Sequence, residues 1–182
     1  MFRRNGNIYR KVQVTFVGAS LLILGAGGHG RVVADVARST GAFDRVAFLD
    51  DAAEGALAPL SEYARFRSDF DVAAVGIGNN ALRLELLLKL RAAGYKTPPL
   101  ISPRAYVSPD AKVGDGTVIE PMAIVNREAT LGIGVIVSVG AIVDHNATVG
   151  DGAHINAGAI CKAGSHVPEK VKLDAGEVVR GY

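Results

Sequence analysis

Three consecutive polar residues, Asp144, His145 and Asn146, could carry out acid–base chemistry. Imidazole is the side chain best suited to proton transfer near neutral pH, and the groups beside it decide how basic it is. We therefore take His145 as a candidate general base, with Asp144 and Asn146 as its polar partners. Asn146 also suits a structural role, because Asn tolerates the positive φ that a tight corner requires.

A second candidate site lies near the N-terminus, where residues 25–30 (GAGGHG) match the pattern G-x-G-x-x-G. Asp50 follows twenty residues after the last of these glycines. Backbone N–H groups at a helix start can bind a diphosphate, and an acid at this distance can accept hydrogen bonds from ribose hydroxyls. The pattern does not separate NAD from a sugar nucleotide, and a glycine turn without a ligand stays an alternative. A domain of about four strands favours a ligand smaller than a dinucleotide, such as a nucleotide sugar.

The segment from Ala105 to Tyr182 repeats every six residues, and this repeat positions His145. Eight of the thirteen hexads begin with Ala, and many end with Gly. The third residue is aliphatic or Cys throughout: Val107, Val113, Ile119, Val125, Leu131, Val137, Val143, Val149, Ile155, Cys161, Val167, Leu173 and Val179. A parallel β-helix has this period, with three hexads to a coil, whereas an amphipathic helix and a half-buried strand do not. The repeat predicts a β-solenoid of just over four coils, left-handed as in known hexapeptide-repeat proteins.

The register of the hexads decides which side chains face outward. His145 occupies a fifth place beside a corner, and His154 and His166 occupy second places, so all three rings should face out of the coil. Cys161 occupies a third place and should face inward, which argues against a role as nucleophile. Glycine in the sixth place supplies the positive φ that a corner needs.

The chain ahead of the repeat alternates strand and helix patterns. We expect strands at 21–25, 46–49 and 72–77, a helix whose inner face is Val32, Val33, Val36 and Ala37, and a second helix at 82–90. This alternation predicts a small Rossmann-like parallel α/β domain over residues 19–101, followed by the β-helix over residues 102–182. Residues 1–18 lack a clean small-x-small cleavage site, so we expect a poorly ordered leader and not a signal peptide.

Composition excludes several classes of partner. The chain is 49% hydrophobic, as in a globular protein, and its net charge of +2 gives no basis for binding nucleic acid. No stretch is long enough to cross a membrane. The single cysteine excludes an internal disulfide and fits a reducing cytoplasm.

Four segments in this order carry a resemblance to a known family: residues 21–30 (LLILGAGGHG), 48–51 (FLDD), 76–80 (GIGNN) and 143–155 (VDHNATVGDGAHI). The chain resembles the bacterial sugar acyltransferases that join a nucleotide-binding domain to a left-handed β-helix, over about Leu21 to Tyr182. These include UDP-4-amino-sugar (bacillosamine-type) N-acetyltransferases, perosamine N-acetyltransferases and sialic acid O-acetyltransferases.

The resemblance implies a homotrimer with acetyl-CoA in the groove between neighbouring β-helices. It implies that His145 is the catalytic base, and that His154 and Ala175 contact the coenzyme. The residues implied to bind the nucleotide sugar are Gly27, Gly28, His29, Asp50, Asp51 and Gly78. The implied reaction is direct acetyl transfer to the amino group of a UDP-4-amino-sugar, without a covalent enzyme intermediate or a metal.

Two departures from the family's pattern bear on this expectation. The family usually has Glu or Asp after the base, where this chain has Asn146, so activation of His145 would come from Asp144 or be weaker. Relatives also continue for further coils that help to hold the coenzyme, so we expect part of the groove wall to be missing.

Three other functions stay open. One is O-acetylation of sialic acid or another sugar. A second is a metal hydrase of the β-helix type, which would need three imidazoles, here His145, His154 and His166, although they lack the close pair expected of that class. The third is a non-catalytic nucleotide-sugar-binding protein, which the amide at Asn146 would suit.

Overall fold

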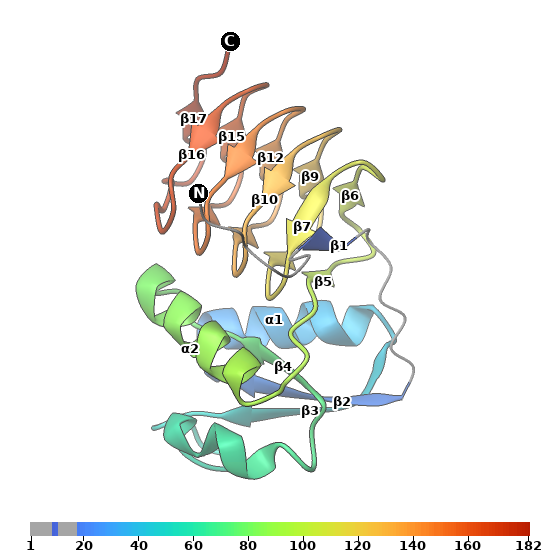
Figure 1. Cartoon of the computed structure of the whole chain (residues 1–182), viewed down its shortest axis with the longest axis vertical. Helices are drawn as coiled ribbons and strands as arrows, with labels where there is room; N and C mark the ends of the chain where they lie inside the picture. Colours follow the sequence, from blue (N-terminus) through green and yellow to red (C-terminus); the bar gives the residue numbers. More distant parts are fainter. Residues whose placement is uncertain (1–8, 11–17) are drawn as a thin grey trace, which may run out of the picture.

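The computed structural model describes residues 9–10 and 18–182. The described residues form two connected domains. Figure 1 shows a small α/β domain below a stack of short strands wound as a three-sided coil. This arrangement confirms the predicted combination of a parallel α/β domain and a β-helix. Neither α-helix in the described ranges has the length and the apolar sequence that a membrane crossing requires.

The α/β domain is a three-stranded parallel sheet between two helices. The strands are β2 (Ala19–Leu24), β3 (Phe43–Leu49) and β4 (Val72–Val75), in the order β3-β2-β4. The helices are α1 (Gly28–Ser39) and α2 (Asn80–Ala92), and a 3-10 helix, η1 (Leu60–Phe66), precedes β4.

Strand β2 is buried on both faces, as expected for a central parallel strand. Leu21 and Ile23 pack with α1 on one face, and Leu22 and Leu24 pack with α2 on the other. The α1 side also contacts Val118 of the β-helix, so α1 lies between the sheet and the coil (Figure 1).

Two expectations for this domain were wrong. Val32 is 36% exposed, because the buried stripe of α1 runs through Gly30, Val33 and Ala37 at helical spacing, and Val32 lies off that stripe. The described part of the sheet has three strands and not about four, since Lys96 forms only an isolated bridge with Val72.

The β-helix has three faces, each a parallel sheet with one short strand per coil. The face that contacts the α/β domain, here the domain face, consists of β5 (Leu100–Ile101), β8 (Val118–Ile119), β11 (Ile136–Val137) and β14 (His154–Ile155). The second face consists of β7 (Lys112–Gly114), β10 (Thr130–Leu131), β13 (Thr148–Val149) and β16 (His166–Val167). The third consists of β6 (Tyr106–Val107), β9 (Ile124–Val125), β12 (Ile142–Val143), β15 (Ile160–Cys161) and β17 (Val178–Val179).

Strand register aligns the outward side chains of each face into a ladder. The second face carries Lys112, Thr130, Thr148 and His166 and is here the polar face. The third carries Tyr106, Ile124, Ile142, Ile160 and Val178 and is here the apolar face. The third-place residues of the hexads point inward and form one continuous core, which includes Cys161.

The sixth place of nearly every hexad turns the chain through a positive φ. This holds for Gly116, Gly134, Gly140, Gly152, Gly158, Gly164 and Gly176, and also for Met122, Glu128, Asn146 and Lys170. The predicted corner role of Asn146 is confirmed by its φ of 57°. This residue belongs to the corner between the apolar and polar faces, here the histidine corner.

Helix α2 rests on the corner between the polar face and the domain face, here the domain corner, formed by Gly116, Gly134 and Gly152. A Cβ on Gly134 would lie 3.1 Å from Cδ2 of Leu87, and one on Gly152 would lie 3.4 Å from Cβ of Leu84. Glycine therefore serves this corner twice, through its backbone conformation and through the close approach of the helix.

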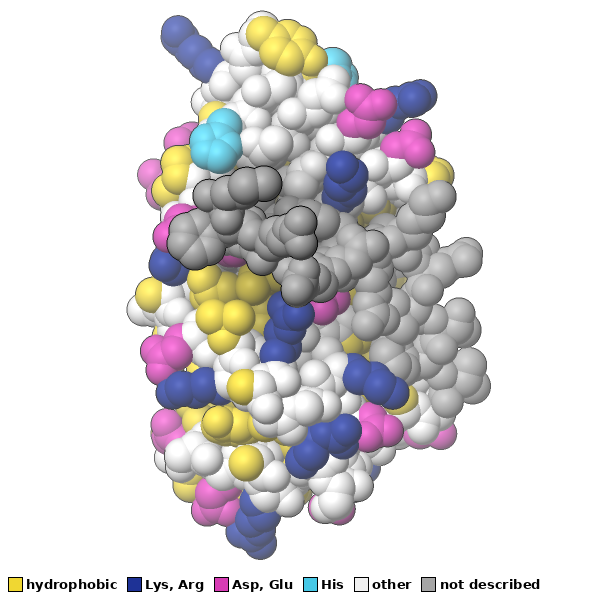
Figure 2. Space-filling model, viewed as in Figure 1, with side chains coloured by type: hydrophobic (Ala, Val, Ile, Leu, Met, Phe, Trp, Pro, Cys, Tyr) yellow, Lys and Arg dark blue, Asp and Glu magenta, His cyan; other side chains and the backbone are white. Residues whose placement is uncertain are grey.

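Most of the predicted leader, residues 1–18, lies outside the described residues. Tyr9–Arg10 form strand β1, which pairs antiparallel with β7 at the start of the polar face. The predicted boundary after Ile101 falls at the end of β5, whose backbone already pairs with β8 of the domain face. Outside the grey atoms, Figure 2 shows positive and negative side chains mixed over this side of the molecule, with no large patch of one sign.

Candidate active site

The glycine turn after β2 contains glycines of two kinds. A Cβ on Gly30 would overlap the carbonyl of Gly25, so close packing of strand and helix requires glycine there. Gly27, Gly28 and Gly78 differ, because a Cβ on any of them would meet no atom of the described chain within 4 Å. These three glycines border open space at the N-terminus of α1 and on the turn after β4, where a ligand could approach the backbone closely.

Asp50 organises this turn through its carboxylate. Oδ2 accepts a hydrogen bond from the backbone N–H of Ala26 at 2.8 Å, and Oδ1 accepts from Ala52 and Ala53 at 2.9 and 2.8 Å. These N–H groups, Ala26 first, hold the pKa of Asp50 below its usual value. Asp51 accepts from the N–H of Leu60 at 2.9 Å. Both predicted ligand-binding acids thus also hold loops of the domain in place.

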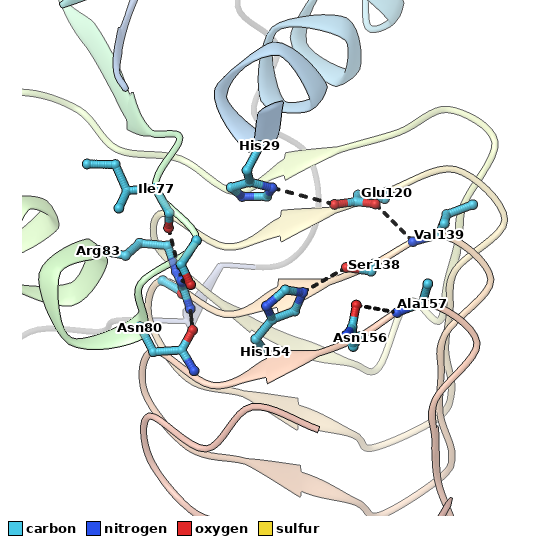
Figure 3. A network of polar contacts seen from close by, with 12 residues as sticks. His29, Ile77, Asn80, Arg83, Glu120, Ser138, Val139, His154, Asn156 and Ala157 are labelled. Atoms are coloured by element: carbon cyan, nitrogen blue, oxygen red, sulfur yellow. Dashed lines mark hydrogen bonds and ion pairs between the residues drawn. The ribbon is translucent and has the colours of Figure 1, made fainter. Parts of the chain in front are cut away.

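His29 points from the start of α1 toward the domain face of the β-helix (Figure 3). Its Nδ1 lies 3.8 Å from Oε1 of Glu120, and its ring centroid lies 6.4 Å from that of His154. Oε2 of Glu120 accepts from the N–H of Val139 at 2.9 Å, and Nε2 of His154 lies 2.9 Å from Oγ of Ser138. The glycine turn therefore meets a cluster of polar side chains, here the junction cluster: His29, Glu120, Ser138 and His154.

Burial sets the protonation states in the junction cluster. It lowers the pKa of His29 and of His154 to about 4, with a further contribution from the Arg83 cation. Burial raises the pKa of Glu120, partly offset by the N–H of Val139. Both imidazoles are therefore neutral at pH 7. Nε2 of His29 and Nδ1 of His154 are buried without a partner in the described chain, so each could hydrogen-bond a ligand.

His154 faces out of the coil as predicted, but the α/β domain covers it and leaves it only 9% exposed. The hexad register fixes the direction of a side chain but carries no information on which face another domain covers. His154 therefore lies in the junction cluster and not on an exposed groove wall. Ala175, the other predicted coenzyme contact, is exposed.

His145 lies exposed at the histidine corner, as the register predicted. Its Nδ1 is 3.2 Å from Nδ2 of Asn146 and 3.5 Å from the hydroxyl of Tyr182. Asp144 makes other contacts: its Oδ1 accepts from the backbone N–H of His145 at 2.7 Å and from Nδ2 of Asn126 at 3.0 Å. The amide of Asn146 is thus in hydrogen-bond range of the imidazole, whereas the carboxylate of Asp144 serves backbone and amide N–H groups.

The predicted site residues fall into two groups within one chain. His29, His154 and the open glycines gather at the domain face. His145 and Asn146 lie at the corner between the other two faces, which in a three-sided coil is opposite the domain face. His145 lies at the histidine corner, His154 on the domain face and His166 on the polar face. No group of three or more His, Cys, Asp or Glu in the described ranges could hold a metal ion.

Sequence analysis missed Glu120, Ser138 and Arg83. The fourth places of the domain-face hexads are polar, which is a weak signal for Glu120 and Ser138. Polar residues on the outside of a coil need no functional explanation, so this pattern alone does not mark a site. Arg83 lies on the buried stripe of α2 with Leu87 and Leu90, and a charge on an apolar helical stripe is a signal in its own right. Cys161 is buried in the core and its pKa is raised to about 11 by burial, then by Glu177, so it is no nucleophile.

Comparisons with known proteins point to one family. The family model for the PglD N-terminal domain matches residues 20–90. The chain is 30% identical over 110 residues to the UDP-N-acetylbacillosamine N-acetyltransferase of Bacillus subtilis (strain 168), a match over 55% of this chain and 50% of that protein. The chain thus matches about half the length of that relative.

Solved structures match most of the chain. The acetyltransferase domain of PglB from Neisseria gonorrhoeae FA1090, in complex with acetyl coenzyme A, has a TM-score of 0.84 and 32% identity, over 88% of this chain and 82% of that one. A histidine-to-alanine mutant of GDP-perosamine N-acetyl transferase from Caulobacter crescentus, in complex with CoA and GDP-perosamine, has a TM-score of 0.77 and 26% identity, over 89% of each chain. From its first domain to its β-helix, the chain belongs to the family of PglD-type sugar N-acetyltransferases.

Proposed function

We propose that the chain is an acetyl-CoA-dependent N-acetyltransferase that acts on the amino group of a nucleotide-linked amino sugar of the UDP-4-amino type. The observation that carries this proposal is the meeting of the open glycine turn with the junction cluster. A helix N-terminus suited to a diphosphate there adjoins buried groups suited to a sugar. The complexes of the related proteins with acetyl coenzyme A, and with CoA and GDP-perosamine, support both substrate classes.

The nucleotide sugar would bind at the carboxyl ends of the parallel strands. Its diphosphate would lie on the N–H groups at the start of α1, where Gly27 and Gly28 allow close approach, and Gly78 would border it from the turn after β4. Asp50 keeps the turn in shape and, with Asp51, would accept hydrogen bonds from ribose. His29 would contact the sugar beyond the diphosphate.

His145 would act as the general base. The hydroxyl of Tyr182, 3.5 Å from Nδ1, can accept a hydrogen bond from Nδ1–H, and so could the amide of Asn146 with its oxygen turned toward the ring; this tautomer leaves Nε2 to accept the proton. The amine nitrogen attacks the thioester carbonyl, loses a proton to Nε2, and the tetrahedral intermediate collapses to the amide and CoA thiolate, which takes up the proton. Asn146 would orient the ring, while Asp144 would act indirectly by holding the corner backbone.

A complete site would need more than one copy of the chain, because His145 lies opposite the domain face. The apolar face offers a surface for association: Tyr106 and Val178 are 56% and 47% exposed at its two ends, with three isoleucines between them. We propose a homotrimer in which His145 of one copy meets the junction cluster of the next. Acetyl-CoA would lie in the groove between them, with Ala175 on its wall and Nδ1 of His154 at its acetyl end. The free thiol of Cys161 fits the cytoplasm as the proposed location.

The test is to incubate the purified chain with acetyl-CoA and a panel of UDP- and GDP-amino-sugars, following release of the CoA thiol and the mass of the sugar product. We expect a gain of one acetyl group on an amino sugar and none on the matched sugar with a hydroxyl in place of the amine. Acetylation of the hydroxyl sugar would instead support an O-acetyltransferase. Nucleotide-sugar binding by calorimetry without turnover would support a binding protein.

The companion variant is His145→Ala. Loss of a general base should lower kcat by roughly two to four orders of magnitude. Melting temperature and nucleotide-sugar binding should stay near those of the parent, because the exposed ring makes few contacts with the coil. His166→Ala, which removes an exposed imidazole from the polar face, is the matched control and should retain full activity. Full activity in His145→Ala would remove the catalytic assignment.

A further inference from the structure

Arg83, near the start of α2, is 1% exposed and lies at the junction of the two domains. Its guanidinium donates hydrogen bonds to six acceptors. Nε donates to the carbonyl of Gly134 at 2.9 Å, Nη1 to Ile77 and Gly78 at 3.1 and 3.4 Å, and Nη2 to Oδ1 of Asn80 and the carbonyls of Gly152 and Ala153 at 2.9, 2.7 and 3.4 Å. Figure 3 shows Arg83 beside Ile77 and Asn80.

These acceptors belong to both halves of the molecule. Ile77, Gly78 and Asn80 belong to the turn after β4 in the α/β domain, here the nucleotide half. Gly78 borders open space there. Gly134 and Gly152 belong to two successive coils at the domain corner, and Ala153 directly precedes His154. The planar fork of a guanidinium can hold several acceptors in fixed directions at once, which the point charge of Lys cannot do.

Every acceptor of Arg83 is uncharged, and none of the ion pairs within residues 18–182 includes this side chain. A buried cation without an acid is costly, and well-packed apolar side chains often replace buried charges without loss of stability. Packing of the two domains against each other would therefore not require an arginine. Leu84 and Leu87 of the same helix already supply apolar contact with the domain corner.

We propose that Arg83 is a positioning residue that fixes the turn bearing Gly78 against the coil bearing His154, and so sets the spacing between the nucleotide half and the junction cluster. This inference rests on the proposed function, because the spacing matters only if one substrate contacts both the nucleotide half and the junction cluster. A nucleotide sugar anchored at the diphosphate would lose its alignment with the junction cluster when the turn shifts. Acetyl-CoA would keep most of its contacts, because it meets His154 only through its acetyl end and is otherwise held in the intersubunit groove.

The test compares Arg83→Lys and Arg83→Gln with Lys89→Gln, an exposed residue of the same helix that pairs with Glu85. We expect the KM for the nucleotide sugar to rise about tenfold in Arg83→Lys and further in Arg83→Gln, with the KM for acetyl-CoA within about twofold of the parent. Lys89→Gln should match the parent in both. Equal effects of Arg83→Lys on both KM values, or none on either, would overturn the proposal.

A milder variant, Asn80→Ala, tests the proposal even if the Arg83 variants fail to fold. Asn80→Ala keeps Arg83 and its backbone acceptors and removes one acceptor together with the bond from Asn80 Nδ2 to the carbonyl of Lys170. We expect the KM for the nucleotide sugar to rise about two- to threefold while that for acetyl-CoA stays unchanged. An unchanged KM for the nucleotide sugar would count against the proposal.

A readout that needs no turnover is the NMR titration of the imidazole signals of His29 and His154. The charged groups that face these rings are Arg83, Glu120, Lys172 and the other ring. Arg83→Gln removes one cation, so both pKa values should rise, whereas Arg83→Lys should keep them low and alter only the chemical shifts. Unaltered titrations and shifts in both variants would overturn the proposal. Altered signals in a chain without acetyltransferase activity would support the contact and reject the proposed function instead.

Discussion

Glu128 and Asn146 stand at the same corner of successive coils, and both adopt the left-handed backbone conformation, with φ values of 58° and 57°. Their strands pair through Ile124 and Ile142, so the two residues occupy equivalent positions. A Glu side chain is therefore accommodated at this corner one coil away from the proposed base. The backbone alone does not require an amide at residue 146.

We therefore predict that Asn146→Glu keeps the fold and strengthens the base. The melting temperature should change by less than about 3 °C, since the substitution copies a residue already tolerated in this conformation. A carboxylate beside Nδ1 raises the pKa of the imidazole, so the acidic limb of the pH–rate profile should move to higher pH and kcat should rise about three- to tenfold. Profiles of kcat/KM against pH, with Glu128→Gln as control, would check this. A lower melting temperature without a gain in rate would show that Asn146 serves the corner alone.

Gly28 and Gly30 should respond in opposite ways to an added side chain. Gly28→Val projects into open space, so the Kd for the nucleotide sugar should rise about tenfold or more while the melting temperature changes little. Gly30→Ala would push a methyl group into the carbonyl of Gly25 and should lower the free energy of unfolding by roughly 1–3 kcal/mol. Calorimetry and denaturant unfolding distinguish the two. Unimpaired binding in Gly28→Val would remove the glycine turn from the proposed site.

Ile142, in the middle of the apolar face, should matter for association. A charge at this position of the proposed interface would be buried without a partner, so Ile142→Asp should shift the mass in solution from trimer toward monomer at micromolar concentration. Thr148→Asp, in the same coil but on the polar face, is the matched control and should leave the mass unchanged. Light scattering reports both. A trimer that survives Ile142→Asp would place the interface on another face.

Stability should fall as the pH drops from about 6.5 to 4. The pKa values of His29 and His154 are lowered from 6.5 to about 4 in the folded chain, so the unfolded chain binds more protons within this window. Each ring contributes at most roughly 3 kcal/mol, present above pH 6.5 and lost as the pH falls through 4. Glu120, whose pKa is raised, opposes this effect. Melting temperatures of the parent and of His154→Gln between pH 4 and 8 should show a flatter profile for the variant, whereas His166→Gln should follow the parent.

The fold could be predicted in outline because each of its sequence patterns is compatible with very few structures. A strict six-residue period with inward aliphatic residues permits few structures besides a β-helix, and the glycine turn between Leu24 and Val33 marks a strand-to-helix connection. The extents of short strands were less certain, since Lys96 has neighbours that suit a strand and yet forms a single bridge. Val32 was misplaced because two adjacent valines, Val32 and Val33, leave the helical phase ambiguous by one position.

The candidate site was only partly predictable, for a different reason. Local spacing shows that His145, His154 and Asn146 point outward, but not what lies against them. The burial of His154 depends on how the α/β domain docks, and docking is set by residues distant in the chain, such as Arg83 and Gly152. Likewise, Asp144 was one expected source of activation for the imidazole, but its Oδ1 accepts from the backbone N–H of His145 at 2.7 Å.

The spacing of paired strands limits how such a chain can change in length. Residues that face one another on neighbouring coils are 18 positions apart, as Lys112 and Thr130 are. Loss or gain of a whole coil would therefore keep every later side chain on its own face. Loss of a single hexad between the α/β domain and His145 would instead turn the rest of the solenoid by one side, carrying the imidazole from the histidine corner to one beside the domain face. Natural insertions and deletions ahead of His145 should thus come in full coils.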